Sequence, residues 1–282
     1  MNTKWEDRRL IRRLSRVCAS GCGARPEESR KIGVVGSCAG AGVTTVVFAF
    51  AEYLAAVRRQ AARPVNKRGA EKPVGVLELR TDAGAPAGCP YDKLGADRHF
   101  AGRDYADFHR LAAEGVPCGN LFNISGGVNW ALRPPAVSGR PDDPLPVSAL
   151  LRLADAAAGD PLLCDIASSA AGETLSELLA DMHRIVCVID PLPSRLLASA
   201  ERIGRIRAAE ARGNPVVWVV NKMNAGVNRK ELFRFLALKD PVFLPALPAE
   251  TLYAAEYACR SAADEPAFAS AFAEITTHLC GK

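Results

Sequence analysis

The sequence predicts an α/β protein with a mostly parallel, doubly wound sheet, helices on both faces, and a short basic helix at the N-terminus. From residue 31 onward, short apolar runs typical of buried strands alternate with longer segments of helical periodicity. Such alternation is typical of strand–helix–strand crossovers, which build parallel sheets. Residues 32–54 add an apolar run, a turn of small residues and a long apolar helix pattern, in that order. We therefore expect ligands at the carboxyl ends of the strands.

Each predicted strand is a short apolar run bounded by turn residues. These runs cover residues 31–35, 74–79, 121–125, 162–166, 184–189, 215–220 and 242–244. The predicted helices have apolar residues every three to four positions. They cover residues 44–59, 103–114, 148–157, 172–181, 194–212, 229–238 and 266–279. Residues 80–98, rich in Gly and Pro, and residues 133–146, with five prolines, are expected to be irregular.

The composition places limits on the compartment and on metal binding. About half of the 282 residues are hydrophobic (49%), which is enough for a large core, and no apolar run reaches the length of a membrane-spanning helix. Nine cysteines without a secretory signal predict reduced thiols. The four histidines have no metal-ligand spacing, so we expect no structural metal. We predict a cytoplasmic protein, with the inner face of the membrane as an alternative place of peripheral attachment.

The net charge is concentrated at the N-terminus. Residues 1–31 carry nine basic and four acidic side chains, and this difference of +5 equals the net charge of the whole chain. The remaining chain is therefore neutral, so no specific nucleic acid is expected as a partner. Leu10, Leu14 and Val17 recur at helical spacing among arginines. We predict that residues 1–30 are an amphipathic extension, and that residues 1–20 attach to an anionic membrane or a protein partner. The alternative is a helix packed on the domain, or a solvated tail.

A small-residue loop after the first strand is close to the phosphate-binding pattern G-x-x-x-x-G-K-[ST]. Ser37 stands at the first glycine of the pattern and Val43 at its lysine, while Gly42 and Thr44 are retained. Backbone N–H groups and a helix N-terminus can hold phosphate without the lysine. The predicted phosphate-binding residues are Gly40, Ala41, Gly42, Val43, Thr44 and Thr45. The alternative is a glycine-rich turn that binds no ligand.

Two polar residues follow other predicted strands at the same edge. Asp165 lies near the end of the strand 162–166, where an aspartate can hold Mg²⁺ together with the hydroxyl of Thr44. Asn221 follows the strand 215–220 and could present its amide to an adenine edge. The predicted cofactor is ATP or ADP with Mg²⁺. The alternative is that the protein binds no cofactor. The alternatives are an aspartate that caps the next turn and an asparagine in an ordinary turn.

Together these segments resemble the ParA/MinD group of deviant Walker A ATPases. The resemblance covers residues 31–260 and rests on the loop, the Asp165 strand and the segment VVWVVNK at 216–222, with the later segments FLP and YAAE. Within the group, the chain is most similar to divergent members related to pilus-associated localisation factors. The resemblance implies a P-loop NTPase-like α/β domain over residues 31–282, and a homodimer as one possible partner.

The chain departs from the active members of this group at three places. Their loop reads K-G-G-x-G-K-T-T, and here Cys38 and Val43 occupy the two lysine positions. Their second strand ends in D-x-D, where this chain has Glu78-Leu79-Arg80. The resemblance therefore implies a degenerate, non-hydrolysing or very slow nucleotide-binding scaffold or positioning factor, a pseudo-ATPase without an assigned catalytic residue. The alternatives are a slow ATPase with a lysine from elsewhere, such as Lys222 or a partner subunit, and a small-molecule transferase.

Overall fold

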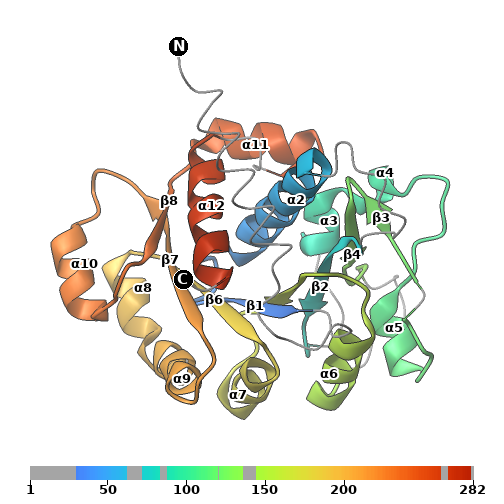
Figure 1. Ribbon diagram of the computed structural model, residues 1–282, viewed down its shortest axis with the longest axis horizontal. Helices are drawn as coiled ribbons and strands as arrows, with labels where there is room; N and C mark the ends of the chain where they lie inside the picture. The colour runs from blue at the N-terminus through green and yellow to red at the C-terminus, as the bar shows by residue number, and fades with distance from the viewer. Residues whose placement is uncertain are drawn as a thin grey trace.

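The computed structural model describes residues 30–61, 72–82, 88–119, 121–135, 144–261 and 266–280. The helix predicted within residues 1–20 lies outside these ranges. The described residues form an eight-stranded sheet with the strand order β3-β4-β2-β5-β1-β6-β7-β8 (Figure 1). Every neighbouring pair is parallel except β3 with β4. The predicted mostly parallel sheet is therefore confirmed.

The strand order brings the carboxyl ends of β5, β1 and β6 side by side at the centre of the sheet. The strands are β1 Lys31–Gly36, β2 Val74–Leu79, β3 Ile124–Ser125, β4 Val128–Ala131, β5 Leu162–Ile166, β6 Arg184–Ile189, β7 Val216–Met223 and β8 Val242–Pro245. All side chains of β1, β2 and β5 are buried, as expected for strands covered on both faces. Val34 of β1 is in register with Asp165 of β5 and with Val186 of β6.

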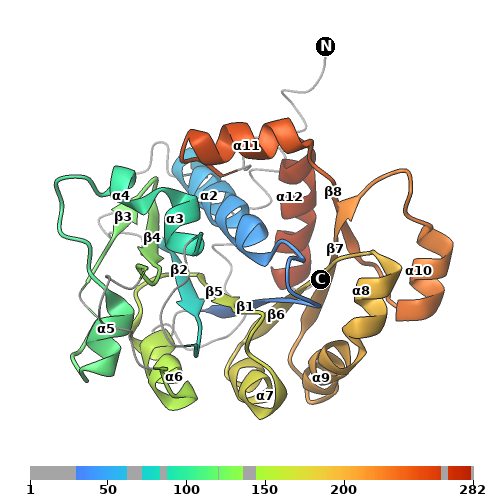
Figure 2. The same ribbon diagram turned by 180° about the vertical axis from the view of Figure 1, so that it is seen from behind.

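Helices cover both faces of the sheet (Figure 1, Figure 2). They are α2 Val43–Ala61, α3 Pro90–Leu94, α4 Ala96–His99, α5 Phe108–Ala113, α6 Val147–Ala156, α7 Gly172–Ala180, α8 Pro193–Ala198, α9 Ala200–Ala211, α10 Arg229–Leu236, α11 Ala249–Tyr257 and α12 Pro266–Cys280. One core lies between the sheet and α2 with α12, and the other between the sheet and α6, α7 and α9. None of the helices formed by the described residues is long and apolar enough to cross a membrane.

Aromatic contacts fix α2 against its neighbours. Phe50 of α2 lies 5.3 Å from Phe272 of α12, measured between ring centroids, and Phe48 packs edge-on against Trp130 of β4 at 5.1 Å. Such pairs contribute about 0.5–1.5 kcal/mol each beyond the area that they bury. Because α2 begins at the loop after β1, these contacts also fix the position of the loop.

Several predicted elements differ from the structure. The segment 80–98 contains the short helices α3 and α4, joined at Gly95, whose φ of 64° favours glycine. The predicted strand 121–125 is only Ile124–Ser125, and β4 was missed; a Gly126-Gly127 turn joins the two strands into a hairpin. The predicted helix 194–212 is divided at Ser199, and α11 was not predicted.

Two helix and strand ends have clear local causes. The predicted helix 103–114 begins only at Phe108, because the Asp107 carboxylate accepts hydrogen bonds from the N–H groups of His109 and Arg110 and caps the first turn. Strand β7 extends beyond the predicted end at residue 220 and includes Asn221 and Lys222, with an irregular register to β8. These two residues therefore lie at the end of a strand, beside the loop after β1.

Candidate functional site

The loop between β1 and α2 has a backbone that requires glycine. Gly40 and Gly42 have φ angles of 74° and 93°, in the left-handed region that side chains disfavour. A Cβ atom on Gly42 would lie 2.4 Å from Nδ2 of Asn221. The two glycines predicted from the sequence therefore allow the curl of the loop and its close approach to β7.

The loop leaves a group of backbone donors open at the start of α2. Ser37 N–H donates to the carbonyl of Val188 at 2.8 Å, and Ala41 N–H to that of Cys38 at 3.3 Å. The N–H groups of residues 42–45, in contrast, have no acceptor among the described residues. They lie at the N-terminus of a 19-residue helix with no acidic residue in its first turn. This arrangement favours an anion.

The predicted magnesium pair comes together. Thr44 Oγ1 donates to Asp165 Oδ2 at 2.9 Å. Asp165 is 4% exposed, and its register partner on β2, Glu78, is 1% exposed. Burial, and then the repulsion from Glu78, raise the pKa of Asp165 to about 7, against the hydrogen bond from Thr44, which lowers it. Two neighbouring carboxyl groups that repel each other would both gain from a cation between them.

The donor set fits Mg²⁺ and not a closed protein cage. Among the described residues, no three Asp, Glu, His or Cys side chains are grouped closely enough to hold a metal ion. Mg²⁺ is usually held by one or two carboxylates together with phosphate oxygens and waters. Thr44 and Asp165 would supply the protein side of such a site, and the bound ion would neutralise phosphate charge.

The raised pKa of Asp165 predicts a pH-dependent stability. Between its ordinary pKa of 3.8 and about 7, the folded protein keeps a proton that the unfolded chain has lost. The free energy of unfolding should therefore fall as the pH rises through this window, by up to about 1.4 kcal/mol per unit. We expect Asp165→Asn to remove this part of the dependence, measured by urea unfolding between about pH 4 and pH 8. The same pH dependence in both proteins would contradict the prediction.

Asn221 and Lys222 both contact the loop. Asn221 is 7% exposed, and its Nδ2 donates to the carbonyl of Ala41 at 2.9 Å. Lys222 has a φ of 58°, and its Nζ donates to the carbonyl of Gly40 at 2.6 Å. Asn221 therefore holds the backbone of the loop through the Ala41 carbonyl. Its contact with adenine stays a prediction.

Asp190, just past the end of β6, holds the Lys222 ammonium. The distance from Lys222 Nζ to Asp190 Oδ2 is 2.8 Å, and Arg195 Nη1 contacts the same oxygen at 2.8 Å. Burial alone would raise the pKa of Asp190. The hydrogen bonds from Lys222 and from the Leu192 N–H, together with the positive charges of Lys222 and Arg195, outweigh this effect and lower the pKa. An anion that recruits Lys222 would therefore compete with Asp190.

The loop forms one wall of a cavity of ≈ 410 Å³. Three basic residues from outside the loop also line it: Arg80, Lys93 and Lys222. Lys93 was not predicted as a site residue, because the segment 80–98 was expected to be irregular. Arg80, interpreted as a lost acidic position, donates to Glu78 Oε1 at 2.9 Å. Positive charge therefore faces the loop although the loop has no lysine.

Arg202 of α9 connects the end of β1 to the segment after β5. Its Nε donates to the carbonyl of Gly36 at 2.6 Å, and its two terminal nitrogens donate to the carbonyls of Ala167, Ser168 and Ala170. Burial lowers the pKa of its guanidinium. Sequence reasoning missed this residue, because an arginine on an amphipathic helix is usually solvated.

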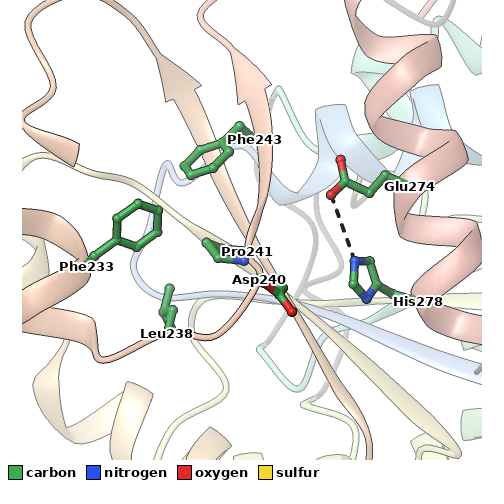
Figure 3. Close-up of a pocket in the computed structure, with 7 residues that line it drawn as sticks. All are labelled: Phe233, Leu238, Asp240, Pro241, Phe243, Glu274 and His278. Atoms are coloured by element: carbon green, nitrogen blue, oxygen red, sulfur yellow. Dashed lines mark ion pairs between the residues drawn. The ribbon is translucent and has the colours of Figure 1, made fainter. Parts of the chain in front are cut away.

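A separate hollow of ≈ 600 Å³ lies beside the edge strand β8 (Figure 3). It is lined by Phe233, Leu238, Asp240, Pro241, Phe243, Glu274 and His278. His278 Nε2 lies 3.9 Å from Glu274 Oε1 on α12. The hollow shares no residue with the cavity at the loop, so we do not include it in the candidate site.

Comparison with known proteins identifies the fold. No protein-family model and no curated protein matches the sequence. Among solved structures, the MinC:MinD complex of Aquifex aeolicus has a TM-score of 0.64 and 16% identity, covering 90% of this chain and 96% of that chain. MinD of Pyrococcus horikoshii in complex with Mg-ADP has a TM-score of 0.62 and 14% identity, covering 88% and 94%. A ParA family ATPase from Chlorobium tepidum has a TM-score of 0.58 and 12% identity, covering 89% and 99%.

The fold is that of the ParA and MinD ATPases. The resemblance inferred from the sequence is confirmed at the level of this ParA/MinD-like P-loop fold. In the ParA/MinD-like sheet, the loop from residue 37 to residue 42 follows the central strand β1 and leads into α2. The candidate site therefore lies where the strands β5, β1 and β6 end.

Proposed function

We propose that this protein binds ATP or ADP with Mg²⁺ at the loop and acts as a scaffold or positioning factor that hydrolyses nucleotide very slowly or not at all. The observation that carries the proposal is the Thr44–Asp165 pair beside the open N–H groups of residues 42–45. The loop would hold the phosphates, and the pair would hold Mg²⁺. Mg-ADP in the similar MinD of Pyrococcus horikoshii supports this choice of ligand.

Slow turnover follows from the position of the charges. Val43 provides neither a donor nor a charge, whereas a P-loop lysine stabilises the phosphoryl group during transfer. Loss of one such donor typically costs about 3–4 kcal/mol of transition-state stabilisation. The side chains of Arg80 and Lys222 are already bound to Glu78 and Asp190. Their use on a phosphate would break these ion pairs.

A slow ATPase is the second candidate, because of one specific contact. Lys222 lines the loop cavity, and its Nζ lies 2.6 Å from the carbonyl of Gly40. In this candidate, the phosphate would draw Lys222 from Asp190 and use it in place of the missing lysine. The two candidates differ in what the removal of Lys222 does to turnover.

Titration calorimetry with ATP and ADP, each with and without Mg²⁺, tests binding. We expect weak, saturable binding that Mg²⁺ strengthens and that Asp165→Ala makes insensitive to Mg²⁺, because the carboxylate serves the ion. A phosphate-release assay then tests turnover in the unmodified protein and in Lys222→Met. We expect negligible turnover in both. Val43→Lys alone should not restore full activity, because residues that act as a unit are not additive.

The outcomes separate the candidates. No binding at millimolar ATP would contradict the nucleotide site and favour an empty loop. Turnover that Lys222→Met abolishes would favour the slow ATPase. The matched control is Lys239→Met, a lysine between α10 and β8 that does not line the loop cavity.

Attachment through residues 1–20 completes the proposal. The complex of MinD with MinC in Aquifex aeolicus makes a protein partner a reasonable choice for this fold, and an anionic membrane and a homodimer are the other partners proposed. Deletion of residues 1–20 should reduce co-sedimentation with anionic liposomes or with the partner, and salt should weaken it, since basic residues contribute about 1 kcal/mol each near a charged surface. The melting temperature should change little. A large drop in melting temperature with unchanged sedimentation would instead mean that the segment packs on the domain.

A further inference from the structure

Another cavity lies between α5 and α6, on the opposite side of the sheet from α2. Its volume is ≈ 300 Å³. It is lined by His109, Arg110, Ala112, Ala113, Arg133, Pro144, Leu145, Pro146, Ala149 and Arg152. We call it the Arg/His cavity. None of the described residues that line it is acidic, and it shares none of them with the loop cavity.

His109 lines this cavity and has a side-chain nitrogen without a hydrogen-bond partner among the described residues. The side chain is 2% exposed, and its Nε2 lies 2.6 Å from the backbone carbonyl of Glu78. A carbonyl oxygen only accepts, so Nε2 carries the proton of the ring. The other nitrogen, Nδ1, is buried and has no hydrogen-bond partner among the described residues. Buried polar atoms are rarely left in this state without a ligand or water to satisfy them.

Burial favours the neutral ring, in which Nδ1 is an acceptor. Burial lowers the pKa of His109, against the carboxyl groups of Glu78 and Asp107, which raise it, and with Arg133, which lowers it further. Neither Glu78 nor Asp107 lines the cavity. A neutral ring with its proton on Nε2 has a lone pair on Nδ1. This atom therefore needs a hydrogen-bond donor from a ligand. A cationic ligand is disfavoured, because three arginine side chains line the same cavity.

The three arginines come from three separate segments. Arg110 extends from α5 and Arg152 from α6, and both are exposed. Arg133 is 3% exposed and fixed at the wall: its backbone N–H donates to Glu78 Oε2 at 3.1 Å, and its Nη1 donates to the Asp82 carbonyl at 2.7 Å. Guanidinium groups bind oxoanions with charge-assisted, often bidentate hydrogen bonds.

We propose that the Arg/His cavity is a second anion site, which binds a small oxoanion that carries a hydroxyl group. The guanidinium groups of Arg110 and Arg152 would bind its oxygens, and Nδ1 of His109 would accept from its hydroxyl. Hydrogen phosphate is the simplest member of this class. Sulfate has a similar size and charge but no hydroxyl near neutral pH, so it is the natural comparison.

Calorimetry of the full-length protein with inorganic phosphate and with sulfate tests the site. At about pH 8, hydrogen phosphate keeps one proton and can still donate a hydrogen bond. We expect saturable phosphate binding, and sulfate binding that is weaker by about tenfold, the usual effect of one hydrogen bond. His109→Gln keeps an amide nitrogen for the Glu78 carbonyl but has no acceptor at Nδ1. It should remove the preference for phosphate.

Two matched double variants locate the phosphate. Arg110→Gln with Arg152→Gln removes two charges from the Arg/His cavity and should weaken phosphate binding by about tenfold or more. Lys93→Gln with Lys222→Gln removes two charges from the loop cavity and should leave the preference for phosphate over sulfate unchanged, even where it weakens anion binding at the loop. The opposite result would place the phosphate at the loop and overturn the proposal, as would phosphate binding no tighter than sulfate. If His109→Gln fails to fold, the two double variants still test the proposal. Their four residues lie on helices or at a strand end and have at least partly exposed side chains, so these substitutions should leave the fold intact.

Discussion

Arg202→Ala should lower the free energy of unfolding by about 3 kcal/mol, the larger end of the range for buried polar groups left without a partner. The guanidinium donates to the carbonyls of Gly36, Ala167, Ser168 and Ala170. Gly36, Ala167 and Ala170 are buried, so water cannot readily replace the lost donor. Urea unfolding of the two proteins measures the difference.

Arg205→Ala is the matched control for this substitution. Arg205 lies on the same helix three residues later and pairs with Glu201 at 3.0 Å, an exposed ion pair within α9. Removal of such a pair costs about 0.3–0.5 kcal/mol. Equal destabilisation by the two substitutions would mean that the helix, and not the contact of Arg202 with the carbonyls, is responsible.

The strands and helices that could be predicted are those whose own residues carry the signal. β1, β5 and β6 are short apolar runs that are buried on both faces, and the predicted bounds of β5 and β6 agree with the structure. β4 was missed because its sequence, VNWA, has a buried polar residue: Asn129 Oδ1 accepts from the Asn123 N–H at 2.7 Å. α11 was missed because it has no buried residue and so no apolar stripe.

The contacts of the candidate site also fall into those that local sequence patterns predict and those that depend on the packing of distant segments. The pairing of Thr44 with Asp165 could be predicted, because both follow from a loop pattern and from the common edge of parallel strands. The bond between Lys222 and Asp190 could not, because it depends on the left-handed backbone of Lys222 and on the neighbouring position of β6 and β7. Lys93 and Arg202 reach the site from helices whose position is set by packing, which leaves no local pattern in the sequence.

Gly42→Ala should have the largest effect on the loop. A methyl group at a φ of 93° costs about 1–3 kcal/mol. It would also lie 2.4 Å from Asn221 Nδ2, which is held by the Ala41 carbonyl at 2.9 Å, while Asn221 Oδ1 accepts from the Lys222 N–H at 2.8 Å. Because Asn221 is fixed at both ends, the loop must move instead. We expect nucleotide binding to fall below detection in calorimetry, together with a lower melting temperature.

Gly40→Ala distinguishes the loss of the contact between Asn221 and the loop from the effect of backbone strain alone. Its φ of 74° is also left-handed, but the atoms nearest to a Cβ there belong to the Arg195 guanidinium, at 3.2 Å. That group is the far end of a flexible and partly exposed side chain, so it can move aside. Gly40→Ala should therefore cost about 1 kcal/mol from strain and weaken nucleotide binding only in part. If both substitutions abolished binding equally while the melting temperatures stayed close, the contact between Asn221 and the loop would not be what shapes the phosphate site.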